Sequence, residues 1–452
     1  MRLPDIFVQS LKSVNGFHQK DFCACHEQEA TVTAVRYNPF KKRVLWNDTN
    51  SSVVPWCSHG RYLFDRISFT LDPYFHAGAY YVQEASSMFV EHVFNTLTFE
   101  HSPKKVLDLC AAPGGKSTLL LSLIDEQDIL VCNEVIKTRV PVLTDNVNKW
   151  GKQQVVITHN DAKDFQRLPA YFDCVLVDAP CSGSGMFRKD ERAIAEWSLE
   201  HVKLCSQRQQ RIVADILPAL KSGGYLLYST CSYSVEENEQ QLDWLLQHFN
   251  LETIRIPLGD WGIVETQSSE QGAWGYRFYP DKIRGEGFFM ACLRKTDGVT
   301  DAVKYSSQKL VTLPKNDNTV LQHWLNDIEQ LFICEVGDYV YAMPNALRRE
   351  VEILTKNLYV KKAGVCVGKM MRAELLPEHQ LALSTLLSGE VARVALDQQQ
   401  ALAYLRKDAQ LQLNNSQQGW ALATYDGLGL GWMKVLPNRI NNYFPKELRV
   451  LR

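Results

Sequence analysis

The stretch VLDLCAAPGGKSTLLLSLI, residues 106–124, combines three local patterns that together indicate an α/β fold. The apolar run Val106–Cys110 predicts a buried strand, and Ser117–Ile124 is typical of a helix. A tight loop of small residues joins them, and its glycines let a ligand approach backbone amides closely. Amides at a helix N-terminus favour a carboxylate or another anion. We therefore expect a strand, a ligand-binding loop and a helix.

The triplet Gly115-Lys116-Ser117 also suits the end of a phosphate-binding loop, which closes with Gly-Lys-Ser/Thr. That motif needs a further glycine five residues before Gly115, where this chain has Cys110. Pro113 also removes an amide N–H that such a loop would use. The sequence therefore disfavours a phosphate-binding nucleotidase.

Strand and helix patterns alternate along the central third of the chain. Further strands are expected at Ile129–Cys132, Val155–Thr158, Cys174–Val177 and Tyr225–Ser229, with helices at Lys137–Lys149 and Leu199–Leu220. This alternation predicts βαβ units, a parallel Rossmann-like sheet and right-handed crossovers. Ligands of such sheets bind beyond the carboxyl ends of the strands.

Acidic residues follow successive predicted strands at that edge. Glu134 closes the second strand, where Rossmann-like folds place an acid that accepts hydrogen bonds from ribose hydroxyls. Asp161 follows the third strand and is suitably placed for an adenine amino group. A single acidic residue after a strand is often only a solvent-exposed side chain that binds no ligand. A glycine loop and two acids in register favour binding of a nucleoside cofactor.

The composition indicates a globular protein of two or three domains. The chain has 452 residues, 45% hydrophobic and 22% charged, and a formal net charge of −2. That charge disfavours nonspecific binding along nucleic acid but not a specific nucleic-acid enzyme.

The sequence has no 18-residue apolar run, and Met1–Phe17 carries no secretion signature, so we expect a cytoplasmic protein without a membrane segment. The twelve cysteines include no CxxC pair, and Cys23-x-Cys25-His26 lacks the usual zinc spacing, so we expect no metal site.

Two cysteines each follow a predicted strand. Cys181 lies in LVDAPCSGSGMF (176–187), and Cys231 lies in GGYLLYSTCSYSVEENEQ (223–240). A buried structural thiol would be the default for either one alone. Two thiols on the ligand-binding edge, flanked by small and hydroxyl residues, favour chemistry instead.

Methylation at C5 of a pyrimidine needs such an arrangement, because that carbon is a poor nucleophile. A thiolate that adds to C6 activates C5, and covalent catalysis of this kind divides one hard step into two easier ones. The thiol must then be eliminated, which gives a second polar group a task. Uracil-5 methylation uses the same logic, although Asp178 beside Cys181 fits cytosine better because a carboxylic acid can protonate N3. A non-catalytic RNA-binding protein on the same fold is the alternative from another class.

Several stretches carry a family resemblance together, in family order and over roughly the first two thirds of the chain. They are GAYYVQEASSM (78–88), DLCAAPGGKST (108–118), NEVIKTR (133–139), ND (160–161), DAPCSGSGMFRKD (178–190), YSTCSYSVEENE (228–239) and RFYPDKIRGEGFFMACL (277–293). They resemble the Sun/Fmu family of S-adenosylmethionine-dependent RNA (cytosine-5) methyltransferases. The stretch LGLGWMKVLPNRINNYFPKELR (428–449) is similar to the small-subunit ribosomal-RNA methyltransferase F type, which adds a PUA-like RNA-binding domain.

The resemblance implies roles for individual residues. Cys231 would be the nucleophile, Cys181 would assist product release, and Asp178 would face cytosine near N3 and the cofactor. The S-adenosylmethionine site would comprise Cys110, Ala111, Ala112, Pro113, Gly114, Gly115, Lys116, Ser117, Glu134, Arg139, Asp161 and Asp178, with Gln83 and Ser86 lining the substrate pocket. The family often has a histidine where this chain has Asp281, so the role of that position is open.

The resemblance also implies the partners and the domain order. We expect 16S ribosomal RNA or the small ribosomal subunit as substrate, transfer RNA as an alternative, and a monomer. The expected parts are an N-terminal RNA-binding extension (1–70), the methyltransferase domain (71–296), a linker (297–319) and a C-terminal region with the PUA-like domain (320–452). A helix is expected near Val320–Phe332. Basic residues suited to RNA lie between Lys434 and Arg452 and at Lys361, Lys362, Lys369 and Arg372.

Overall fold

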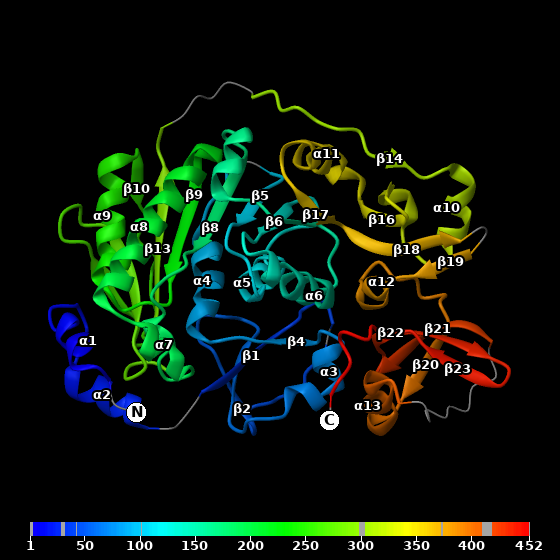
Figure 1. The fold of residues 1–452 in the computed structure, drawn as a ribbon, viewed down its shortest axis with the longest axis horizontal. Helices are drawn as coiled ribbons and strands as arrows, with labels where there is room; N and C mark the ends of the chain where they lie inside the picture. Colours follow the sequence, from blue (N-terminus) through cyan, green and yellow to red (C-terminus); the bar gives the residue numbers. More distant parts are fainter. Residues whose placement is uncertain are drawn as a thin grey trace.

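A large sheet forms the centre of the computed structural model, which describes residues 3–28, 32–41, 43–100, 102–297, 303–371, 374–408 and 418–451 (Figure 1). Five parallel strands in the order β9-β8-β5-β6-β7 make up its middle. They are β5 (Lys105–Asp108), β6 (Ile129–Asn133), β7 (Val155–Thr158), β8 (Phe172–Asp178) and β9 (Leu220–Thr230). The predicted strands and the α/β fold class are therefore confirmed.

Side chains that alternate along these strands build two cores, one on each face of the sheet. On β5, Val106 belongs to one core and Leu107 to the other. The first face is covered by α4 (Phe89–Thr96), α5 (Gly115–Leu120) and α6 (Val140–Trp150). The second is covered by α8 (Leu199–Ile216), α9 (Glu239–His248) and α11 (Arg348–Asn357).

The helix predicted at Leu199–Leu220 is too long at its end. The α-helix α8 ends at Ile216, a single turn of 3₁₀ helix follows, and Leu220 already begins β9. Pro218 explains the difference, because a proline cannot continue an α-helix.

Antiparallel strands close both sides of the sheet. On one side lie β13 (Phe288–Lys295), β12 (Trp274–Phe278) and β11 (Val264–Gln267), and β10 (Leu251–Thr253) pairs with β13. On the other side, β17 (Val360–Ala363) pairs with β7. This strand comes from the C-terminal region, so that region completes the central sheet and is not joined to it by a linker alone.

The N-terminal part packs on the edge where the parallel strands end. Its elements are α1 (Asp5–Ser10), α2 (Gln19–Glu27), α3 (Pro73–His76) and the sheet β2 (Ser51–Val53), β3 (Gly60–Leu63), β1 (Thr33–Tyr37) and β4 (Tyr80–Val82). Phe7 and Phe22 of the two first helices contact Tyr233, and Phe7 also contacts Phe187. Phe187 and Tyr233 are thus buried core residues.

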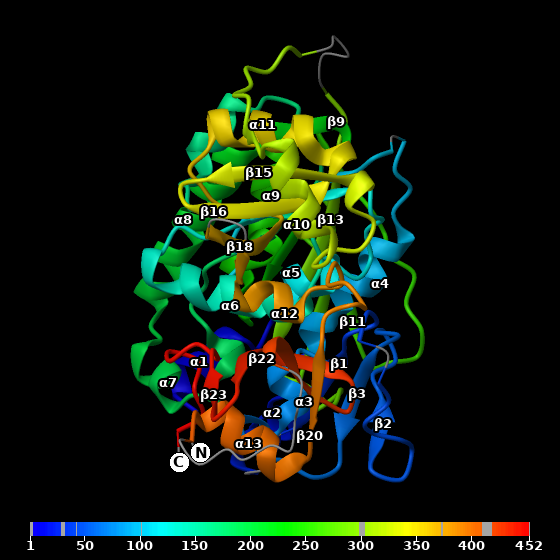
Figure 2. The ribbon, with the colours of Figure 1, turned by 90° about the vertical axis from the view of Figure 1, so that its right-hand side faces the viewer.

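Two further sheets form the C-terminal region, one above the other in Figure 2. The first contains β14 (Val311–Thr312), β15 (Leu331–Val336), β16 (Tyr339–Pro344), β18 (Val365–Met371) and β19 (Glu374–Pro377), with α10 (Lys315–Gln322) and α12 (His379–Leu383). The second contains β20 (Arg393–Leu396), β21 (Gly419–Tyr425), β22 (Leu428–Leu436) and β23 (Arg439–Asn442), with α13 (Gln398–Arg406).

Two predictions for this region are wrong. The helix near Val320–Phe332 is displaced: α10 ends at Gln322, and Phe332 is a buried residue of β15. Asp327 adopts a left-handed conformation that ends any helix there. Lys362 is buried on β17 and donates a hydrogen bond to Asn148, so it is not an RNA-binding surface residue. Arg372, Arg452 and residues 298–302 of the predicted linker lie outside the described residues.

Candidate active site

A cavity of about 310 Å³ opens at the carboxyl edge of the parallel strands. Cys231, at the end of β9, lies in its wall together with the glycine loop between β5 and α5. The lining residues are Tyr81, Val82, Gln83, Glu84, Ser87, Asp108, Cys110, Ala111, Ala112, Pro113, Gly115, Lys116, Asp178, Met186, Cys231, Glu286, Gly287 and Phe288. The predicted nucleophile and the predicted cofactor loop therefore share one cavity.

The glycine loop is held by side chains from the next βα unit. Gly114 has φ = 113°, which glycine adopts without strain, and it caps the start of α5. Arg139 Nη2 donates to the Ala112 carbonyl oxygen at 2.5 Å, and Asn146 Nδ2 donates to that of Pro113 at 2.8 Å. A Cβ atom on Gly115 would lie 3.3 Å from the Tyr81 ring, so a side chain there would fill the approach to the amides.

Two buried carboxylate oxygens near this loop receive no hydrogen bond from any residue that the structure describes. They are Asp108 Oδ1 and Glu134 Oε2. Ser117 Oγ donates to the other Asp108 oxygen at 2.7 Å, and burial raises the pKa of Asp108 to about 7. Arg139 Nη1 lies 3.5 Å from Glu134 Oε2. Buried acceptors without donors fit a ligand that brings hydroxyl or amine groups, as a nucleoside cofactor does.

Asp161 lies at the start of the 3₁₀ turn Ala162–Arg167 and caps it through the Lys163 amide. Its carboxylate also accepts from Arg211 at 3.2 Å. Although it follows β7 as predicted, it does not line the cavity described above. Its proposed contact with adenine therefore stays a prediction.

Asp178 and Lys116 form an ion pair inside the cavity. Lys116 Nζ lies 2.8 Å from Asp178 Oδ2, and Ser229 Oγ donates to Asp178 Oδ1 at 2.8 Å. Burial disfavours the charge of Lys116, but neighbouring acidic groups, Asp178 first and then Asp108, together outweigh burial and raise the pKa of the lysine above its ordinary value. The last residue of β8 is thus held in one orientation, with its carboxylate toward the cavity.

The two cysteines lie in direct contact. Cys181 Sγ and Cys231 Sγ are 3.1 Å apart, although 50 residues separate them in the sequence. The hydrogen bond with Cys231 and burial raise the pKa of Cys181 well above its ordinary value, which keeps this thiol protonated at neutral pH. The Gly185 amide donates to the Cys231 carbonyl oxygen at 2.8 Å and joins the two loops. The expectation that both thiols reach one edge of the sheet is met.

The two residues predicted to line the substrate pocket differ in position. Gln83 lines the cavity, and its Oε1 accepts from Arg36 Nε at 2.9 Å. Ser86 is fully buried and donates to the Glu286 carbonyl oxygen at 2.9 Å, so its hydroxyl supports the pocket wall. Asp281, in place of the family's histidine, has one buried carboxylate oxygen that receives no hydrogen bond within the described chain.

Several cavity residues lie in the family stretches but had no predicted role of their own. They are Glu84, Met186 and Phe288, and the tertiary fold brings them to the cavity beside Tyr81. Arg36 is also unexpected: it is buried and donates to the Gly115 carbonyl oxygen at 3.1 Å, which braces the start of α5.

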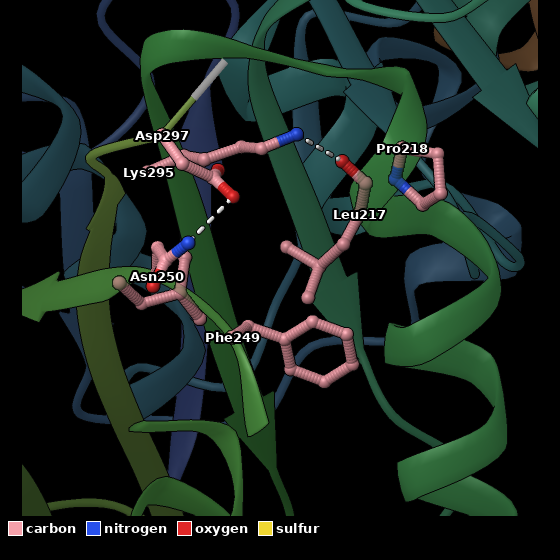
Figure 3. Close-up of a pocket in the computed structure, with 7 residues that line it drawn as sticks. Leu217, Pro218, Phe249, Asn250, Lys295 and Asp297 are labelled. Atoms are coloured by element: carbon pink, nitrogen blue, oxygen red, sulfur yellow. Dashed lines mark hydrogen bonds between the residues drawn. The ribbon is translucent and has the colours of Figure 1, made fainter. Parts of the chain in front are cut away.

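A smaller cavity, of about 130 Å³, lies at the opposite edge of the sheet (Figure 3). Lys295, at the end of β13, donates to the Leu217 carbonyl oxygen at 3.0 Å, and Asn250 donates to Asp297 at 2.9 Å. These contacts join secondary-structure ends and supply no nucleophile. Within the described ranges no group of histidine, cysteine and acidic residues is arranged to hold a metal ion, and no helix could span a membrane.

Comparison with known proteins decides the family. Three family models match consecutive parts of the chain: the N-terminal domain of 16S rRNA methyltransferase RsmF (residues 3–85), 16S rRNA methyltransferase RsmB/F (96–294) and the methyltransferase RsmF PUA domain (391–450). A relative from Aliivibrio fischeri, ribosomal RNA small subunit methyltransferase F, is 30% identical over 99% of this chain and 97% of its own. The protein of that name from Vibrio cholerae is 32% identical over 95% and 88%. The chain belongs to this family.

As a member of the ribosomal RNA small subunit methyltransferase F family, the chain is an S-adenosylmethionine-dependent methyltransferase. Its resemblance to the Sun/Fmu family and its predicted cofactor are thereby confirmed. A solved methyltransferase homologue from Pyrococcus horikoshii is 29% identical and covers 65% of this chain and all of its own, with a TM-score of 0.52. The NSun6 structure from the same organism, with SFG, is 18% identical with a TM-score of 0.56 and shows the shared fold.

Proposed function

We propose that this chain methylates C5 of a cytosine in 16S ribosomal RNA, with Cys231 as the nucleophile. The observation that carries the proposal is the pair of sulfurs 3.1 Å apart beside the cavity that contains the glycine loop. Methyltransferases that act on amino groups need no thiol, whereas methylation at C5 needs one to add and then to leave. The relatives' names supply the class of RNA.

In the addition step, Cys231 Sγ forms a bond to C6 of the cytosine, and electron density moves toward C5 and N3. Asp178 faces the cavity beside Cys231 and interacts with N3, where the ring charge changes. S-adenosylmethionine, when bound, supplies the methyl group that C5 accepts. The residues that would hold it are the loop Cys110–Ser117, Glu134, Arg139, Asp161 and Asp178. Glu134 Oε2, which is buried and receives no hydrogen bond from the described residues, suits a ribose hydroxyl.

In the release step, a solvent water takes up the C5 proton, the electrons of the C5–H bond restore the C5–C6 double bond, and the S–C6 bond breaks. The electron pair returns to the Cys231 sulfur. Cys181 is within hydrogen-bond distance of that sulfur, and its raised pKa keeps a proton on it. A protonated Cys181 therefore stabilises the departing thiolate.

The target cytosine must be unpaired or extruded from its helix to reach Cys231. Gln83 lines the pocket, and Ser86 fixes the adjoining 284–287 loop. The basic segment from Lys434 to Arg449, on β22 and beyond, would contact RNA phosphates. The division of the chain at residues 70, 296 and 319 into an RNA-binding extension, methyltransferase domain, linker and PUA-containing region remains part of the proposal, as does a monomer.

The test is methylation of small-subunit RNA from a strain that lacks this gene. We expect tritium transfer from labelled S-adenosylmethionine to 16S RNA, naked or in the assembled subunit, and one new bisulfite-resistant cytosine. Transfer RNA serves as the parallel substrate. Label on transfer RNA alone would contradict the assigned substrate, and no label at cytosine C5 of any RNA would contradict the chemistry.

A further inference from the structure

A buried carboxylate lies behind the two cysteine loops. Glu237 belongs to the 3₁₀ turn Val235–Glu237, and its side chain is fully buried. It does not line the active-site cavity, so no substrate group touches it there. A buried acid without a cation needs other hydrogen-bond donors, and their identity shows what the acid does.

Both cysteine loops supply these donors. Ser182, the residue after Cys181, donates its amide to Glu237 Oε1 at 2.8 Å and its hydroxyl to Oε2 at 2.5 Å. Ser232, the residue after Cys231, donates its hydroxyl to the same Oε2 at 2.5 Å. One carboxylate oxygen thus binds the immediate neighbours of both thiols.

Two further side chains complete this network. Gln209 of α8 donates to Glu237 Oε1 and to the Pro180 carbonyl oxygen, each at 3.1 Å, so it holds the chain just before Cys181. Asn238 accepts from Thr230 Oγ1 at 2.6 Å and donates to the Ser232 carbonyl oxygen at 2.8 Å. Cys181 and Cys231 are therefore each held on both sides.

We propose that Glu237 is the positioning residue that keeps the two thiols in contact, so that addition by Cys231 and release by Cys181 can follow each other at one cytosine. The roles of the two thiols in this proposal rest on the proposed function, whereas the geometry of the thiol pair does not. Without Glu237 the loops would keep the hydrogen bond from the Gly185 amide to the Cys231 carbonyl oxygen, but Ser182 and Ser232 would lose the carboxylate that they share next to the two sulfurs. A misplacement of about 1 Å costs on the order of 10²-fold in rate.

The test measures the thiol pair directly, without RNA or cofactor. The full-length protein is treated with diamide, which takes up two thiol hydrogens as it becomes a hydrazine and leaves a disulfide, and the Cys181–Cys231 peptide is quantified by mass spectrometry. Glu237→Ala is expected to slow this cross-link by about tenfold or more. Glu237→Gln, which keeps a hydrogen-bonding group, is expected to retain more of the rate.

Glu236→Ala is the matched control, because Glu236 is the exposed neighbour on the same turn. It is expected to cross-link at the wild-type rate. In methylation assays, Glu237→Ala is expected to lower kcat by about 10²-fold and leave KM for RNA unchanged. If Glu237→Ala does not fold, Ser232→Ala carries the test, since it removes one of the shared hydrogen bonds from the same network.

Each outcome decides one claim. A Glu237→Ala protein that is folded and cross-links as fast as wild type overturns the positioning role. If Glu237→Ala slows the cross-link but the wild-type protein methylates no RNA, the positioning role stands and the proposed function is contradicted. A slowed cross-link with a matching loss in kcat supports both.

Discussion

Asp178→Asn removes one negative charge from the cavity and leaves the shape of the side chain almost unchanged. Ser229 Oγ can still donate to the oxygen that the new amide keeps, but the Lys116 ammonium, which lies 2.8 Å from Asp178 Oδ2, loses its carboxylate partner. We expect kcat for methylation to fall by about 10²–10³-fold, the effect of losing one preorganised group at a developing charge (about 2.7–4 kcal/mol).

The effect on stability is expected to be small. The Asp178 side chain is 33% exposed, so solvent screens its ion pair with Lys116. We expect a loss of about 1 kcal/mol in the free energy of unfolding. Kinetics at saturating RNA and cofactor, together with urea unfolding, measure the two effects separately.

Asp173→Asn is the matched control, because it lies at the other end of the same strand. Asp173 Oδ1 pairs with Lys221 at 2.5 Å, and its side chain is only 7% exposed. Asp173→Asn should lower the free energy of unfolding at least as much as Asp178→Asn does, and it should leave kcat unchanged. An Asp178→Asn enzyme within about threefold of the wild-type kcat, or one whose loss matches that of Asp173→Asn, would refute the reasoning about the cytosine ring.

Two further predictions concern the cofactor and a buried lysine. Glu134→Ala should weaken S-adenosylmethionine binding by about tenfold or more, because a hydrogen bond to a charged acceptor contributes about 1.5–3 kcal/mol to binding. Calorimetry measures this affinity, and an unchanged affinity would contradict the ribose role. Lys362→Met should stabilise the protein most at and below about pH 7. Burial lowers the pKa of Lys362 to about 7 against an ordinary 10.5, so the folded state binds fewer protons than the unfolded state between these values. The gain should therefore shrink as pH rises toward 10, whereas exposed Lys361→Met should show no such trend in thermal unfolding.

The sequence alone predicts the sheet and the reactive groups well, because both leave local patterns. The strand predicted at Val155–Thr158 has the same bounds in the structure, and the position after a strand end was enough to bring Cys181 and Cys231 to one edge. These inferences need only the rule that parallel strands end on the same side of a sheet. They do not depend on which distant segments pack together.

Features that depend on distant contacts were not predictable. Lys362 has the sequence context of a surface cluster, but pairing of β17 with β7 buries it. Ser86 belongs to a family motif, but its hydroxyl faces the 284–287 loop, 200 residues away in the sequence. Glu237 is one of several acids in SVEENE, and nothing local distinguishes it from exposed Glu236. Burial of a polar group is set by its partners, which a single sequence does not identify.

The division of labour between the two thiols is the central claim, and a denaturing gel tests it most directly. Wild type, Cys181→Ala and Cys231→Ala are each incubated with labelled 16S RNA and S-adenosylmethionine, and the RNA that stays attached to protein after denaturation is measured. Cys181→Ala should accumulate a covalent protein–RNA adduct, because addition proceeds and release is slowed, while Cys231→Ala should form none. An adduct that accumulates only with Cys231→Ala would contradict the assignment and exchange the two roles.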